Sequence, residues 1–349
     1  MKILKRIFAF ASISIVIASC SATNQLTMSA VEPAPVHIAS DVQRIGIINR
    51  SLPAEGNGGL DTVDKILSAE GKNLDKHGAE AALASVQSEL ERLQRFESVE
   101  ILETIPEIQK GLGVLPAALT WAQVDKICDQ YGVDVLFSLA FYDTDTKASV
   151  QATEMEIPNP VGIKAKVPAI AVTLRTNIQN GWRIYDPATK QILDEYAFND
   201  NLVNTGKGLN PVKAVKTVLN RKEAVVETSS HVGNYYAGRI TPYSRRVTRN
   251  YFVKGTDNFV VGMRRAQSGQ WNRAAELWEQ EVSNPDSKIA CRACYNMAII
   301  SEINGDLDKA LSWAQRSYSD YAEREALQYI KILNYRKSQQ RRLDRQLAK

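Results

Sequence analysis

Apolar positions in the first two thirds of the chain alternate between the spacing of strands and that of helices. A short apolar run at 44–49 predicts a buried strand, and apolar residues three and four apart over 77–96 predict an amphipathic helix. A second short strand follows at 99–102, and a longer one at 133–142. This alternation indicates strands and helices packed in layers.

The helix expected before the longer strand has recognisable ends. Thr120 and Gln123 have the spacing of a capping box, in which each side chain bonds the backbone of the other residue. Gly132 is placed to end the helix, because glycine readily adopts the left-handed conformation found there.

The following segment predicts a β-meander. Asn180-Gly181 favours a two-residue hairpin, and Asp186-Pro187 favours a second turn. The expected strands and the helix after them are 169–178, 182–185, 192–198 and 212–228. The order β-α-β-α-β followed by antiparallel strands predicts an N-terminal α/β domain with a mixed sheet over 42–255. This order resembles the small α/β domain of periplasmic lipoproteins such as penicillin-binding-protein activators and the curli secretion lipoprotein.

The C-terminal region repeats itself. The motif starting at Gly269 recurs at Gly305, an offset of 36 residues, and each copy predicts helix, turn at glycine, helix. The motif resembles the tetratricopeptide repeat. We expect repeats and a closing helix over 256–335, a basic tail at 336–349, and an α+β protein overall. Two repeats bury too little apolar surface to be stable alone, so they need a further cover.

Paired helices of this kind leave a concave face that binds peptides or helices of other proteins. By the resemblance, its inward residues are Phe259, Met263, Tyr295, Ile299 and Glu302. The alternative is that these residues pack against the closing helix or the first domain. Met263 and Ile299 stand where the carboxylate-binding type of repeat has Lys and Arg, which argues against binding of a C-terminal carboxylate.

The N-terminus predicts export. A basic start is followed by an apolar run at 7–18, which is too short to span a bilayer and is typical of a cleaved signal. The run ends in Ile17-Ala18-Ser19-Cys20, which resembles the bacterial lipobox. The resemblance implies cleavage of residues 1–19 and lipidation of Cys20.

The residues after Cys20 suggest where the protein is sorted. Residue 21 is Ser and not Asp, which by resemblance to Gram-negative lipoproteins implies the outer membrane. No acidic cluster at 21–30 resembles a surface-export tag, so we expect the body to face the periplasm. Residues 20–41 are polar and contain two prolines, which predicts a tether.

Charge gives little support for nucleic-acid binding. The formal net charge of +4 includes three positive charges that leave with residues 1–19. Seven of the remaining basic residues lie in 331–349, so the rest of the chain is acidic on balance.

Candidate chemistry is sparse. Cys291 and Cys294 form a CxxC pair within an expected helix, which favours a core role over the two alternatives, a disulfide and a metal or redox site. No arrangement of residues resembles a catalytic triad or a metal motif. The sequence therefore predicts no enzyme, no cofactor and no metal.

An unusual stretch at 235–254 combines arginines with aromatic residues. Arg245, Arg246 and Arg249 would suit an anionic glycan or a small anionic ligand. The alternative is an exposed strand or linker whose arginines pair with acidic residues of the same protein.

The hypothesis that follows is a lipid-anchored adaptor that binds another envelope protein through its repeats. Its alternative is a module that binds an anionic glycan through 235–254.

Overall fold

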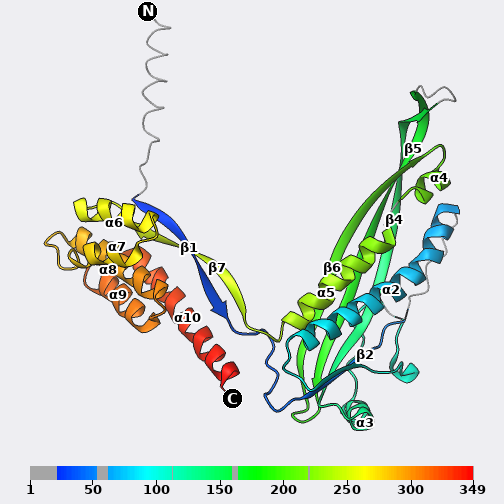
Figure 1. Ribbon diagram of the computed structural model, residues 1–349, viewed down its shortest axis with the longest axis horizontal. Coiled ribbons are helices and arrows are strands. Elements are labelled where there is room, and N and C mark those ends of the chain that lie inside the picture. Colours follow the sequence, from blue (N-terminus) through cyan, green and yellow to red (C-terminus); the bar gives the residue numbers. More distant parts are fainter. Residues whose placement is uncertain (1–21, 53–61, 112, 159–163, 219–220, 349) are drawn as a thin grey trace, which may run out of the picture. The chain divides into compact units, whose positions relative to one another are not determined.

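The structure is a computed structural model that describes residues 22–52, 62–111, 113–158, 164–218 and 221–348. Cys20 and the signal therefore lie outside the described residues. The described chain forms two compact units. Residues 35–241 make the sheet unit, and residues 22–34 with 242–348 make the helical unit (Figure 1).

The sheet unit contains a five-stranded mixed sheet in the order β3-β2-β4-β5-β6. β2 runs parallel to both β3 and β4. β5 lies between β4 and β6 and runs antiparallel to both. The strands are β2 (Arg44–Asn49), β3 (Ser98–Ile101), β4 (Val135–Pro158), β5 (Lys164–Asp186) and β6 (Gln191–Gly208). The predicted α+β class with a mixed N-terminal sheet is confirmed.

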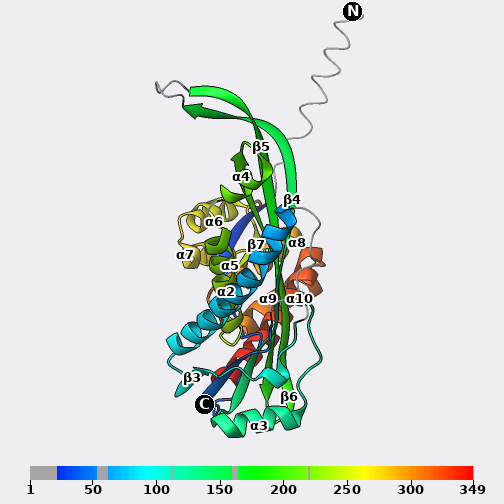
Figure 2. The ribbon, with the colours of Figure 1, turned by 90° about the vertical axis from the view of Figure 1, so that its right-hand side faces the viewer.

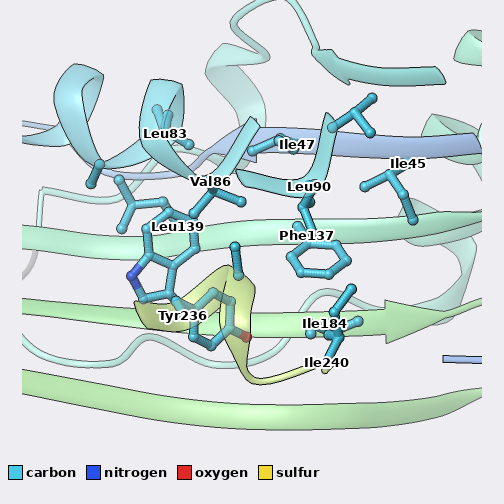
Figure 3. Close-up of a cluster of buried hydrophobic side chains, with 14 of the residues drawn as sticks. Ile45, Ile47, Leu83, Val86, Leu90, Phe137, Leu139, Ile184, Tyr236 and Ile240 are labelled. Atoms are coloured by element: carbon cyan, nitrogen blue, oxygen red, sulfur yellow. The ribbon is translucent and has the colours of Figure 1, made fainter. Parts of the chain in front are cut away.

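Helices cover both faces of this sheet. α2 (Thr62–Arg92) and α5 (Arg221–Gly238) lie side by side on one face (Figure 2). One buried cluster joins the helices to the sheet and includes Val86 of α2, Tyr236 of α5 and Phe137 of β4 (Figure 3). The other face is covered by η1 (Pro106–Ile108) and α3 (Trp121–Tyr131), and α4 (Pro211–Lys216) packs near the end of β6.

The predicted ends of α3 are confirmed. The Thr120 hydroxyl accepts a hydrogen bond from the Gln123 amide at 3.3 Å, and the Gln123 side chain accepts one from the Thr120 amide at 3.0 Å. Gly132 ends the helix with φ of 65°.

The predicted hairpin at Asn180-Gly181 is wrong, since β5 runs through both residues. Gly181 pairs with Phe141 of β4, beside an irregularity in the strand pairing between Leu139 and Phe141. A Cβ atom at Gly181 would lie 2.4 Å from Cε1 of Phe141. Glycine is therefore required there for close approach and not for a turn. The second turn, at Asp186-Pro187, is confirmed.

Two predicted helices have different limits. The helix expected at 77–96 begins at Thr62 and ends at Arg92, and the one expected at 212–228 is divided into α4 and α5. β4 and β5 are long continuous strands where the sequence predicted only short ones. Their full length was not predicted, because the exposed part of the β4–β5 hairpin is polar and lacks the apolar alternation that marks a strand.

The helical unit combines a two-stranded antiparallel sheet with five helices among its described residues. The strands are β1 (Thr23–Glu32) and β7 (Tyr243–Phe252), here called the ribbon. The helices are α6 (Asp257–Gln267), α7 (Trp271–Glu279), α8 (Ser287–Ile303), α9 (Leu307–Ser319) and α10 (Arg324–Leu347). The two predicted helix–turn–helix units are confirmed, and their turn glycines, Gly269 and Gly305, have φ of 80° and 81°.

The expected tether at 20–41 is wrong over its described part. Leu26 and Ala30 of β1 are buried in the helical unit, while Val36 and Ile38 are buried in the sheet unit. The segment is polar because alternate residues of β1 face solvent, and a half-exposed strand of small polar residues has the composition of a linker.

Two other limits are corrected. The boundary expected at 255 lies at Pro242, because β7 pairs with β1 in the helical unit. The expected tail at 336–349 continues α10 to Leu347. Leu343 is buried, and the side chain of Gln346 bonds the amide of Ala34 at 2.8 Å. Among the described residues, no helix combines the length and the hydrophobicity needed to span a bilayer.

Candidate protein-binding surface

The residues expected to line an open groove lie inside the helical unit. Phe259, Tyr295, Ile299 and Glu302 are buried, and Met263 is half-buried. The ribbon fills the space that the two repeats leave between them. These residues therefore do not line an open groove.

Aromatic side chains of β7 occupy this space. The Phe252 ring packs edge-on against Tyr295 at 5.2 Å between centroids, and Tyr251 lies 5.9 Å from Trp278. The Asn296 side chain bonds both the amide and the carbonyl of Phe252 at 2.7 Å. The ribbon and α10 thus supply the cover that two repeats require.

A buried charge network fixes β7 to α8 and α10. Nε and Nη2 of Arg249 each donate to a carboxylate oxygen of Glu302 at 2.8 Å. The Tyr329 hydroxyl donates to the same carboxylate at 2.7 Å, and Nε of Arg336 lies 3.5 Å from it. Burial acts to lower the pKa of Arg249, but Glu302 outweighs it and the pKa is raised. Glu302 is therefore a structural ion-pair residue in this fold.

The three arginines proposed for an anionic ligand do not converge. Successive side chains of a strand point to opposite faces, so Arg245 and Arg249 share the helix-facing side of β7 while Arg246 points to the other. Arg249 is paired with Glu302, and Arg245 lies 3.2 Å from Glu32. The alternative prediction was a strand whose arginines pair with acidic residues of the same protein. It holds for Arg245 and Arg249.

A groove of about 250 Å³ lies between α7, α8 and the start of α9. Met297 and Ile300 form its buried apolar part, and Ala275 adjoins them. Its polar margin is formed by Asn272, Glu276, Glu279, Ser301, Asn304, Asp306 and Lys309. An apolar centre with a polar margin is typical of a surface that takes one side chain of a partner.

The carboxylates at this groove are not equivalent. Asp306 caps α9 by accepting from the Lys309 amide at 2.8 Å. Glu276 and Glu279 are exposed, lie three residues apart on α7, and form no ion pair within the described chain. They are thus free to pair with basic groups of another molecule. This groove could not be predicted from the sequence, because acidic residues on an expected helix first suggest a solvated face.

A second, wider hollow of about 610 Å³ lies on the β4–β5 hairpin. It is lined by Glu154, Glu156, Lys166 and Lys207 together with Thr153 and Met155. None of these residues is buried, so the hollow offers no apolar anchor point. We therefore regard the groove at α7 and α8 as the better candidate.

The CxxC cysteines lie inside α8, as predicted. Cys291 and Cys294 are buried free thiols, and burial raises the pKa of Cys291 to about 12 and that of Cys294 to about 11. Both are components of the helix packing. The described residues contain no group of three or more His, Cys, Asp or Glu side chains placed to hold a metal ion.

Comparison with known proteins places the chain in a family. A family described as a domain of unknown function, DUF8603, matches residues 42–252, and a second such domain, DUF6340, matches residues 260–338. No curated protein matches the chain.

Two solved structures share 10% sequence identity with it. The PelC dodecamer from Paraburkholderia phytofirmans has a TM-score of 0.24, and the match covers 62% of this chain and 98% of that chain. A neuraminyllactose-binding hemagglutinin homologue from Helicobacter pylori also has a TM-score of 0.24, with 60% and 91% covered. These values are too low to carry a functional argument. Because the first domain match spans well over half of the sequence, the chain belongs to the DUF8603 family.

Proposed function

We propose that this protein is a non-enzymatic adaptor, anchored by lipid to the outer membrane, which binds another envelope protein on its helical unit. The observation that carries the proposal is the groove between α7 and α8, with its apolar centre and two carboxylates that form no ion pair with any described residue. The partner would insert an apolar side chain next to Met297 and Ile300. Its Lys or Arg residues would pair with Glu276 and Glu279.

The anchor in this proposal comes from the sequence. The lipobox at Cys20 supplies the lipid, and Ser21 directs the protein to the outer membrane with its body in the periplasm. Several acyl chains on one residue give durable attachment, since each buried methylene contributes about 0.8 kcal/mol.

The proposal can be tested by photo-cross-linking in the cell. A photoreactive residue replaces Asn272, which is exposed and lines the groove, or Gln315, which is exposed on α9 and does not line it. Capture of one envelope protein from position 272 and not from 315 is the expected result.

Charge reversal then links the capture to the carboxylates. E276K/E279K should abolish capture from position 272, because the groove would repel a basic partner. The control is E223K/E227K on α5, which makes the same charge change at exposed residues of the other unit. Capture that survives the reversal in α7, or is lost equally in both variants, contradicts the proposal.

A further inference from the structure

Two arginine side chains are buried beneath residues 113–119, on the α3 face of the sheet. Arg50 follows the last residue of β2, Arg183 lies in β5, and they are 3% and 5% exposed. Nη2 of Arg50 donates to the Ala117 carbonyl at 3.2 Å, and Nη1 of Arg183 donates to the Pro116 carbonyl at 2.6 Å. Because these acceptors are consecutive residues, the two guanidinium groups converge on one place.

Positive charge exceeds negative charge at this place. Arg183 has a carboxylate partner, since its Nε donates to Glu195 at 2.6 Å. Arg50 has no carboxylate partner among the described residues, and its Nε donates to the Ile108 carbonyl at 3.3 Å. Burial is the main cause that lowers the pKa of Arg50, and Arg183 adds to it, whereas the neighbouring Tyr185 hydroxyl acts in the opposite direction without outweighing them. A guanidinium stays protonated in proteins, so an uncompensated buried charge remains and is costly.

Two polar atoms here have no hydrogen-bond partner within the described chain, namely Nη1 of Arg50 and the hydroxyl of Ser138. Ser138 lies in β4, where it pairs with Ile48 of β2 on one side and with Arg183 on the other. Paired residues of neighbouring strands point to the same face, so the Ser138 hydroxyl lies on the side of the two arginines. Nearly all buried polar atoms are satisfied, and a pair of orphans beside an excess positive charge indicates a missing acceptor.

We propose that Arg50, Arg183 and Ser138 form a binding site for a small oxyanion, such as a carboxylate or phosphate group. The oxygens of the anion would accept hydrogen bonds from Nη1 of Arg50 and from the Ser138 hydroxyl. Its negative charge would balance the guanidinium of Arg50, which has no carboxylate partner among the described residues. The site lies just beyond the carboxyl end of β2, beside its parallel neighbour β4 and the antiparallel strand β5.

Thermal unfolding of the mature protein in different salts tests this site. The melting temperature is measured in chloride and again after phosphate, sulfate or acetate has replaced the chloride at constant ionic strength. A saturable rise of the melting temperature with at least one oxyanion is expected, and the effective salt identifies the chemistry of the ligand. No rise with any of the three salts overturns the proposal.

Three variants assign the response to these residues. S138A should weaken the apparent oxyanion affinity several-fold, yet melt in chloride at the same or a higher temperature, because it removes an orphaned hydroxyl. R50M should lose the response, whereas R175M, at an exposed arginine of the same strand as Arg183, should retain it. If R50M does not fold, S138A decides.

Equal responses of the wild type, S138A and R175M overturn the site, since they would reflect a general salt effect. A lower melting temperature of S138A in chloride also overturns it, because the hydroxyl would then already have a partner in the ligand-free protein.

Discussion

Glu302 is the buried acid on which the centre of the helical unit depends. It accepts hydrogen bonds from Arg249 and Tyr329 and lies near Arg336. E302Q keeps the shape but leaves the buried guanidinium of Arg249 and the half-buried one of Arg336 without this counter-charge. We expect the free energy of unfolding to fall by about 3 kcal/mol, measured by urea denaturation, since breaking a buried pair costs roughly 3–5 kcal/mol.

The matched control is D308N, which removes the exposed partner of Lys337 in an ion pair between α9 and α10. An exposed pair contributes about 0–1 kcal/mol, so D308N should have little effect. Equal effects of D308N and E302Q would mean that the network contributes no more than a surface pair.

The resemblance to the tetratricopeptide repeat predicted the inward position of Glu302 but not its role. The repeat register correctly gave it an inward direction, together with Phe259, Tyr295 and Ile299. What occupies the inner space could not be read from the register, because β1 and β7 lie more than 200 residues apart in sequence. The pairing of Arg249 with Glu302 joins residues 53 positions apart and could not be read from the sequence either, so three neighbouring arginines resembled one site.

At the scale of helices and strands, the sequence predicted correctly those features whose contacts involve only residues close by in the chain. The cap at Thr120 and the end at Gly132 were predicted correctly, because they depend on residues within one turn of α3. Asn180-Gly181 was misread, because its environment is set by Phe141, some 40 residues earlier in the chain. The orphaned atoms of Arg50 and Ser138 could not be predicted at all, since they follow from the pairing of three strands.

The strand interpretation of Gly181 can be tested by substitution. G181A places a Cβ atom 2.4 Å from Phe141 and 2.7 Å from Leu115, so one of these side chains must move. Overpacking of this kind costs about 1–3 kcal/mol, and urea denaturation should show a loss in that range.

G238A is the control for this substitution, since a Cβ atom there meets no atom within 4 Å and the residue lies at the end of α5. It should be neutral or slightly stabilising, because alanine has less freedom than glycine in the unfolded chain. A neutral result for G181A would mean that β4 and β5 are less closely packed at this point than the structure indicates.

For the whole molecule, the main consequence is that the helical unit has two ends in the sequence. Its first strand comes from residues 23–32 and the rest from 242 onwards, so the sheet unit is inserted within it. A deletion of residues 256–349 would therefore leave the ribbon without the helices that cover Tyr251 and Phe252. Point substitutions in the groove separate binding from folding more cleanly than such a truncation.

The early start of β1 also limits how far the helical unit can lie from the membrane. Under the proposed lipidation, three Cα-to-Cα steps lead from Cys20 to Thr23, and an extended chain spans at most about 3.6 Å per step. The first strand would then begin within about 11 Å of the lipidated residue. A 21-residue tether would have allowed several times that distance.

Energy transfer to an acceptor dye in the bilayer measures this distance. A donor at Gln25, an exposed residue near the start of β1, should transfer efficiently in lipidated protein bound to vesicles. Insertion of a 20-residue Gly/Ser linker between Ser21 and Ala22 should lower the transfer, since such a linker adds about 25 Å on average. Equal transfer with and without the linker would mean that the helical unit stays at the membrane by contacts of its own and not through a short connection. Low transfer in both proteins would contradict the lipid anchor at Cys20, and with it the proposal that the adaptor is held at the membrane.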